Sequence, residues 1–167
     1  MLTFFNQYRR LTLGLCMLAL LAACQSTPVT TSPFNAAQVA ALTEQGFRQT
    51  DDGWELSFTD KLLFDFNVSN LTSSSRMAIR KISAALIKVD ITHMRIEGHT
   101  DNEGKEAYNN KLSLARASVV ADAMVAAGVP RANLAIHGLG MSKPVASNAT
   151  KDGQAENRRV TIIVSAP

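Results

Sequence analysis

Two periods of hydrophobicity run along residues 36–164, and together they predict helices that alternate with strands. In "GWELSFTDKLLF", residues 53–64, every second residue from Trp54 to Phe58 is apolar, and this period of two predicts a strand or hairpin. Three further strands are predicted at "MRIEG" (94–98), "NLAIHG" (133–138) and "RRVTIIV" (158–164).

Apolar residues spaced three and four apart predict two helices between these strands. The first, residues 71–90, begins with serines that can cap it, and its apolar positions are Met77, Ile79, Ile82, Leu86 and Val89. The second is long, covers residues 105–128, and is closed by Gly128 and followed by Pro130.

A short helix at residues 36–45 precedes these elements, with Asn35 as its N-cap and Gly46 as its stop. The element order after this helix is β-α-β-α-β-β. Such an order implies an α+β fold in which helices pack against one sheet. No helix is expected between the last two strands, so this pair can be antiparallel and the sheet mixed.

The first 24 residues have the layout of a secretory signal and a lipidation site. Arg9 and Arg10 precede an uncharged apolar run at 11–24, which is shorter than the roughly 20 residues of a transmembrane helix. Its end, "LAAC", resembles the lipobox of bacterial lipoproteins, which implies cleavage before Cys24 and lipidation of that residue. A signal cut elsewhere would leave Cys24 an ordinary thiol.

Composition agrees with an exported protein. Cys16 leaves with the signal and Cys24 would carry lipid, so no disulfide is expected. Gln25 stands where inner-membrane lipoproteins of enteric bacteria commonly carry aspartate, which favours the outer membrane. Without the two arginines of the signal the net charge falls from +3 to +1, and nothing indicates a nucleic-acid partner.

The stretch "IEGHTDNEG", residues 96–104, carries the most promising chemistry, because Glu97, His99 and Asp101 occupy alternate positions. One explanation is a metal site, in which His99 and Asp101 are joined by His137 from a neighbouring strand. Another is acid/base catalysis by Glu97 and Asp101, as in glycoside hydrolysis. The structural alternative is that Glu97 pairs with a basic neighbour on the sheet face.

A third explanation uses charges of opposite sign. Asn109, Ser113 and Arg116 share one face of the long helix, whose first turns pass the loop that contains Asp101. A zwitterionic amino acid could give its ammonium to Asp101 and its carboxylate to Arg116, because a guanidinium donates two parallel hydrogen bonds to a carboxylate. The alternative, that Asp101 caps the helix and Arg116 pairs with a nearby acid, stays equally open at this point.

Five short motifs, "GHTDNEG", "NNKLSLARA", "GLGMSKP", "SNAT" and "ENRRV", occur in this order between residues 98 and 160. Together they resemble the OmpA-like peptidoglycan-binding domain, over residues 54–166. The resemblance implies a mixed four-stranded sheet with helices on one side. It also implies a binding protein, not an enzyme, that needs neither cofactor nor metal and holds the diaminopimelate of the peptidoglycan stem.

By matching motifs, Asp101 would bind the ammonium of diaminopimelate and Arg116 its carboxylate. The supporting residues that the resemblance implies are Asn109, Thr100, Leu112, Arg158 and Asn67. Two positions depart from the family pattern. Asn67 replaces a common aspartate, so it can accept a hydrogen bond but brings no charge, and Gln154 replaces a common arginine.

The segment before this domain is similar to that of YfiB-like lipoproteins, with the words "EQGF" and "DGWE". This similarity implies a second partner besides peptidoglycan, a YfiR-like periplasmic repressor whose capture derepresses a diguanylate cyclase. The alternative is a purely structural tether, and whether two copies pair as a homodimer is left open. The expected parts are a signal peptide (1–23), a lipidated tether (24–35), a regulatory helix and segment (36–53) and the OmpA-like domain (54–166).

Overall fold

The computed structural model of the 167-residue chain describes residues 33–64 and 70–165. Its sheet has five strands in the order β1-β2-β5-β3-β4. The strands are β1 (Arg48–Thr50), β2 (Gly53–Thr59), β3 (Met94–Gly98), β4 (Leu134–Gly138) and β5 (Arg159–Val164). The predicted signal, Cys24 and Asn67 lie outside the described residues.

The sheet is mixed, as predicted, but two details of the prediction were wrong. β3 and β4 are parallel, whereas β5 is inserted between β2 and β3 and runs antiparallel to both, so the last two strands are not neighbours. The sheet also has a fifth strand, because residues 48–59 form a hairpin in which β1 pairs with β2. β1 escaped prediction since it is three residues long and wholly exposed, which gives it no apolar period.

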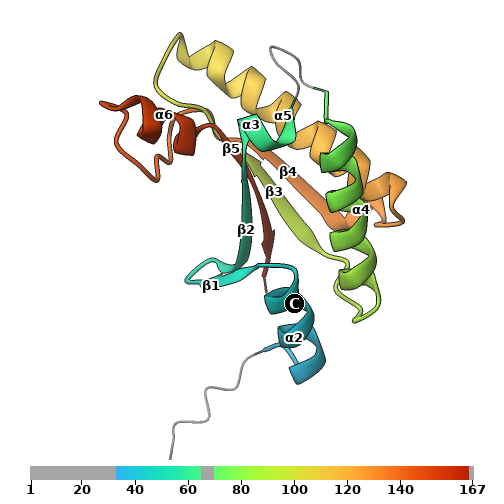
Figure 1. Ribbon diagram of the computed structural model, residues 1–167. Helices are drawn as coiled ribbons and strands as arrows, with labels where there is room; N and C mark the ends of the chain where they lie inside the picture. Colours follow the sequence, from blue (N-terminus) through green and yellow to red (C-terminus); the bar gives the residue numbers. More distant parts are fainter. Residues whose placement is uncertain (1–32, 65–69, 166–167) are drawn as a thin grey trace, which may run out of the picture. The chain divides into compact units, whose positions relative to one another are not determined.

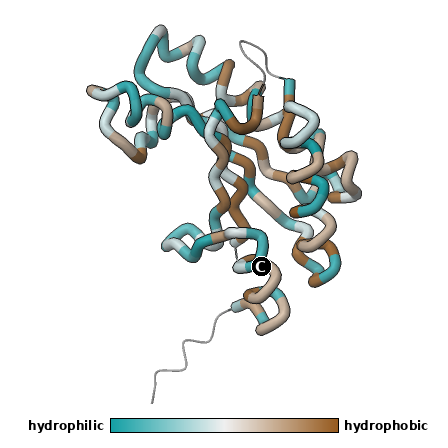
Figure 2. The backbone as a smooth tube through the Cα atoms, in the orientation of Figure 1, coloured by the Kyte–Doolittle hydropathy of each residue, from teal (hydrophilic) through white to brown (hydrophobic). Residues whose placement is uncertain are grey.

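Helices α4 (Ser73–Ile87) and α5 (Glu106–Ala126) cover one face of the sheet (Figure 1). Between them and the strands lies the core, and Figure 2 shows the apolar residues concentrated along the central strands. The fully buried side chains of this layer include Ile79, Leu86, Val120, Met124, Ile96 and Ile162. The two predicted helices therefore form, with their ends one to three residues inside the predicted bounds.

The predicted apolar face of α4 is correct except at its first position. Ile79, Ile82 and Leu86 are buried and Val89 packs partly against the core, but Met77 is 67 % exposed. Ser75 is buried instead, and its hydroxyl donates to the carbonyl of Leu62 at 2.7 Å. A polar side chain thus takes the inward position in the first turn, because a backbone carbonyl is there to be satisfied.

The N-terminal helix α2 (Ala36–Glu44) forms as predicted and packs on the domain. Asn35 and Gln38 make a reciprocal capping box. Leu42 is completely buried, and the Gln38 amide donates to the carbonyl of Val89 at 3.1 Å, just beyond the end of α4. Gly46, at φ +87°, lets the chain leave the helix in a left-handed conformation.

Three short helices were not predicted. These are α3 (Asp60–Leu63), the 3₁₀ turn at Arg131–Asn133 and α6 (Lys151–Asn157), which lies between β4 and β5. Each has seven residues or fewer, too few for a helical period to appear in the sequence. Within residues 33–64 and 70–165, no helix is both long and apolar enough to cross a membrane.

Two glycines let the backbone of α5 touch the sheet. A Cβ at Gly98, the last residue of β3, would lie 2.0 Å from the carbonyl oxygen of Ser113. A Cβ at Gly138, the last residue of β4, would lie 2.5 Å from the backbone nitrogen of Leu114. No other residue type fits either position, so these glycines fix how α5 sits over the strand ends.

We expect Gly98→Ala to lower the free energy of unfolding by about 3 kcal/mol, because its methyl group would force α5 away from β3. Gly104→Ala is the matched control. Its Cβ meets nothing closer than 4.0 Å, although φ is +90°, so only the left-handed conformation costs about 1 kcal/mol. Urea unfolding measures the free energy of unfolding of both variants. Equal losses of free energy would contradict the close-contact explanation.

Candidate functional site

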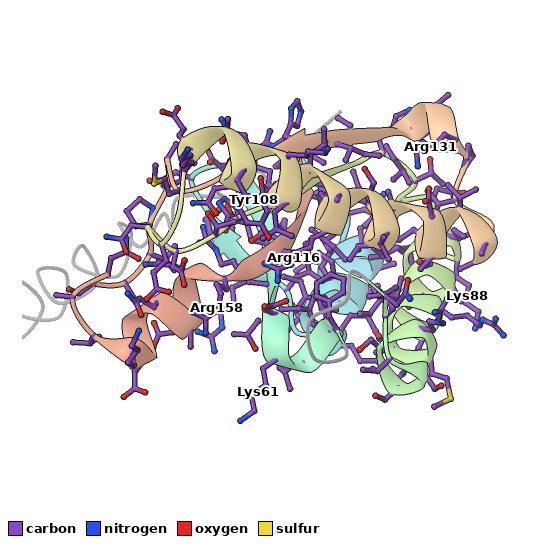
Figure 3. All side chains as sticks on the ribbon, turned by 90° about the horizontal axis from the view of Figure 1, so that it is seen from above. Lys61, Lys88, Tyr108, Arg116, Arg131 and Arg158 are labelled. Atoms are coloured by element: carbon purple, nitrogen blue, oxygen red, sulfur yellow. The ribbon has the colours of Figure 1, made fainter. Side chains whose placement is uncertain are left out.

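Three of the polar residues at the candidate site meet because β5 runs antiparallel to both β2 and β3. The C-terminal ends of β2 and β3 therefore lie beside the N-terminal end of β5. Asp60 directly follows β2, Asp101 lies three residues after β3, and Arg158 directly precedes β5. Figure 3 looks down on this end of the domain, which Figure 2 shows to be mainly hydrophilic around α6 and the start of α5.

Asp101 is buried, and its carboxylate is held on both oxygens. Nη1 of Arg158 donates to Oδ2 at 2.6 Å, and the backbone N–H of Glu103 donates to Oδ1 at 3.1 Å. Thr100 braces the same loop: its hydroxyl donates to the carbonyl of Asp101, and its N–H donates to the carbonyl of Gly140, both at 2.9 Å. Asp101 thus presents a fixed negative charge at the end of β3.

Arg116 points from α5 toward the same end of the sheet and pairs with Asp60. Its Nη2 lies 2.8 Å from Oδ2 of Asp60, and the two side chains are 14 % and 24 % exposed. Its guanidinium carbon lies 5.6 Å from the centroid of the Phe64 ring, within the range of a cation–π contact. The sequence did not identify Asp60, because only the pairing of β2 with β5 brings it here.

The two ion pairs belong to one network. The backbone N–H of Asp60 donates to the carbonyl of Arg158 at 2.8 Å, which joins the Arg116–Asp60 pair to the Arg158–Asp101 pair. Figure 3 shows Arg116 on α5 and Arg158 where α6 meets β5, near α3. The predicted acid and base therefore reach the same end of the fold, but each is paired with a different internal partner and not with the other.

Two residues of α5, Asn109 and Ser113, hold the loops beside this network. Asn109 is buried, and its amide donates to the carbonyl of Glu103 at 2.9 Å, which ties the loop after β3 to the helix. Ser113 is buried too, and its hydroxyl accepts from the N–H of Gly140 at 2.9 Å. Leu112 is half-buried. In the free protein Asn109 therefore holds the loop that follows β3.

Side-chain amides of α6 hold the loop that precedes this helix. The buried Asn157 accepts from the N–H groups of Val145 and Ala146 at 2.8 and 3.0 Å. Gln154 donates to the carbonyl of Asn148 at 3.2 Å and accepts from Lys151 at 3.0 Å. At this position, where the family commonly has arginine, an uncharged amide therefore holds the loop.

Glu97 is a residue of the sheet face, as the structural alternative proposed. Its Oε1 lies 2.8 Å from Nε of Arg95. It sits in β3, whereas Asp101 is bound to Arg158 in the loop beyond, so the two carboxylates have separate cationic partners. Within the described ranges, no group of three or more histidine, cysteine or acidic residues could hold a metal ion.

His99 is 2 % exposed, and its Nδ1 has no hydrogen-bond partner among the described residues. Burial, followed by the positive charges of Arg159 and Lys143, lowers its pKa to about 3. Glu97, 3.8 Å away, does not reverse this shift because it is too distant for a hydrogen bond. Burial likewise lowers the pKa of Arg159, against the opposing charges of Glu55 and Glu97.

The OmpA family matches residues 63–158, which contain most of this site. The outer-membrane lipoprotein YfiB of Pseudomonas aeruginosa PAO1 is 52 % identical over 159 residues, 95 % of this chain and 94 % of that protein. The chain belongs to the OmpA family. Its similarity to YfiB extends through the N-terminal segment, and it is a YfiB-like outer-membrane lipoprotein that faces the periplasm, as predicted.

Two solved structures place the fold in the same family. The cell wall anchor of the T6SS from Pseudomonas aeruginosa is 29 % identical, with a TM-score of 0.64 over 78 % of this chain and 95 % of that one. The peptidoglycan-associated lipoprotein from Burkholderia pseudomallei is also 29 % identical, with a TM-score of 0.56 over 62 % of this chain and 88 % of that one. The OmpA-like fold predicted from the motifs is confirmed.

The depressed pKa of His99 predicts that the fold loses stability in acid. Between pH 6.5 and about 3 the unfolded chain binds a proton at His99 that the folded chain does not. As the pH falls through this range, the free energy of unfolding should therefore decrease by up to about 1.4 kcal/mol for each pH unit. His99→Gln should flatten the urea-midpoint profile there, whereas His93→Gln, at an exposed position, should not. Equal acid slopes in wild type and His99→Gln would disprove the assignment.

Proposed function

We propose that this chain binds the stem peptide of peptidoglycan non-covalently, through diaminopimelate, while a lipid on Cys24 anchors it in the outer membrane. The observation that carries the proposal is the network Arg116–Asp60–Arg158–Asp101, in which charges alternate at the end of the sheet. The names of the cell wall anchor and the peptidoglycan-associated lipoprotein, both at 29 % identity, support a cell-wall ligand.

A zwitterion fits this network because it offers one charge for each side. The ammonium of diaminopimelate would donate to Asp101, and the carboxylate beside it would accept from Arg116. Arg158, already at 2.6 Å from Asp101, would turn part of its guanidinium to another carboxylate of the stem. Thr100 and Leu112 would line the site, Asn109 would hold its loop, and Asn67 would supply an uncharged acceptor.

The same charges argue for binding without catalysis. A general acid needs a carboxyl group whose surroundings favour the protonated form. Asp101 instead accepts hydrogen bonds from an arginine and a backbone N–H, and Glu97 lies beside Arg95. These contacts support a carboxylate that attracts an ammonium group. The proposed parts of the chain remain the signal at 1–23, the tether at 24–35, the regulatory segment at 36–53 and the binding domain at 54–166.

Asp101→Ala and Arg116→Ala should each abolish retention on purified peptidoglycan. Each change leaves one charge of the ligand unpaired, at a cost of about 2–5 kcal/mol in a desolvated site. Pull-down with insoluble sacculi measures retention, and circular dichroism checks the fold. Wild-type protein should also release no soluble wall fragments.

The control for charge is Arg131→Ala, which removes an exposed arginine paired with Asp122 on the far half of α5. It should bind as well as wild type. Wild-type retention by folded Asp101→Ala or Arg116→Ala would refute the proposed site. Fragments released by wild type but not by Asp101→Ala would indicate an enzyme.

We further propose that the N-terminal segment captures a YfiR-like periplasmic repressor and so derepresses a diguanylate cyclase. The support is that similarity to YfiB covers 95 % of the chain, well beyond the OmpA match at 63–158. The segment also contains a helix, α2, that packs on the domain. Leu42 of α2 is fully buried, Val39 packs partly against the core, and Gln38 bonds to Val89. Release of α2 would expose this apolar face to the repressor.

Val39→Pro should strengthen repressor capture, because it removes the bond from the Val39 N–H to the carbonyl of Asn35 and breaks α2. Ala36→Pro is the matched control, since the first helical position tolerates proline. Binding of purified repressor to each variant, with sacculus retention in parallel, is the measurement. If both variants capture the repressor equally, α2 is only a spacer and the purely structural tether is favoured.

A further inference from the structure

The contact between Asp60 and Arg116 has a role that the proposed ligand does not explain. Arg116 is the cation that would receive the carboxylate of diaminopimelate, yet Asp60 already occupies it at 2.8 Å. We propose that Asp60 is an internal competitor for Arg116, which the ligand must displace and which thereby sets the affinity and specificity of the site. This inference rests on the proposed function.

The pair is incomplete on both sides, which makes it displaceable. An arginine and a carboxylate in their best geometry form two parallel hydrogen bonds. Here only Nη2 and Oδ2 are joined. Nε of Arg116 and Oδ1 of Asp60 are both buried and have no hydrogen-bond partner among the described residues. A ligand carboxylate that takes both Nη2 and Nε would satisfy a donor that Asp60 leaves unused.

The surroundings keep Arg116 in place when its partner changes. The ring of Phe64 lies 5.6 Å from the guanidinium carbon, so the cation retains one contact without Asp60. Asp60 is the first residue of α3 and is bound through its backbone N–H to Arg158, so its side chain can turn away while its backbone stays fixed. Exchange at Arg116 then needs only a rotation of the Asp60 side chain.

The competition predicts discrimination between carboxylate and amide. A ligand carboxylate can replace Asp60 because it brings an equal charge and can accept two parallel hydrogen bonds from Arg116. An amide brings no charge, so displacing Asp60 for it would leave a half-buried guanidinium without a counter-ion. Asp60 therefore makes the site reject stems whose diaminopimelate is amidated at the carboxylate that Arg116 would bind, more strongly than Arg116 alone would.

The test is calorimetric binding of the mature chain to a soluble stem tripeptide that ends in diaminopimelate. Asp60→Asn keeps the size of the side chain but removes its charge. We expect it to bind the tripeptide about tenfold more tightly, the factor that one lost charge-assisted contact of about 1.4 kcal/mol gives. The same variant should melt at a lower temperature, because Arg116 loses its partner in the free protein. Opposite changes in affinity and melting temperature are not expected of a residue that only supports the fold.

Two controls complete the design. Asp122→Asn removes an equal charge from an exposed pair with Arg131, and should leave the affinity unchanged. The tripeptide amidated at the side-chain carboxylate of diaminopimelate should bind more weakly than the acid. The ratio of the affinity for the acid to the affinity for the amide should be smaller in Asp60→Asn than in wild type.

The outcomes separate this inference from the proposed function. If wild type does not bind the tripeptide, and neither variant does, the proposed function itself fails. If wild type binds and Asp60→Asn binds equally or more weakly, Asp60 is no competitor and the inference fails while the proposed function stands. If Asp60→Asn and Asp122→Asn both bind more tightly, and to the same extent, the gain is a general effect of charge and the inference also fails.

Discussion

The direct contact of α5 with the ends of β3 and β4 is the constraint on which the site depends. Gly98 and Gly138 leave no room for a side chain between sheet and helix, so the backbone at Ser113 and Leu114 rests on the strands. This contact sets the height of α5 above the sheet and hence the position of Arg116, one turn further along. Asp60, Asp101 and Arg158 lie at the ends of the strands. A small shift of α5 would therefore separate Arg116 from Asp60.

Electrostatic balance follows from this placement. Removing charges from water is costly, and a site that holds several must pair them. The network does so with alternating signs, so each charge in the free protein has an internal partner of opposite sign. His99 contributes no charge, because burial and neighbouring cations keep its ring neutral down to a pH of about 3. The protein thus keeps a buried histidine beside the loop that carries Asp101 without adding a charge there.

The domain separates its two proposed tasks in space. The charged network lies where β2 and β3 end, whereas α2 packs near the end of α4 through Leu42 and the bond from Gln38 to Val89 (Figure 1). A change at α2 can therefore occur without breaking a contact of the ion-pair network. This separation suits the proposal of a protein that remains bound to the wall while another surface becomes available, and α2 lies outside the OmpA match at 63–158.

The sequence by itself determined the elements whose patterns are local. The period of hydrophobicity located α4, α5 and the strands β2 to β5, and the Asn35 cap located α2. The order of short motifs identified the family and singled out Asp101 and Arg116 as candidates. Only the tertiary structure decided which strands are neighbours, because pairing depends on contacts between segments that are distant along the chain. The insertion of β5 between β2 and β3 brings Asp60 to Arg116, and neither the short α3 nor a lone aspartate carries a local signal of that meeting.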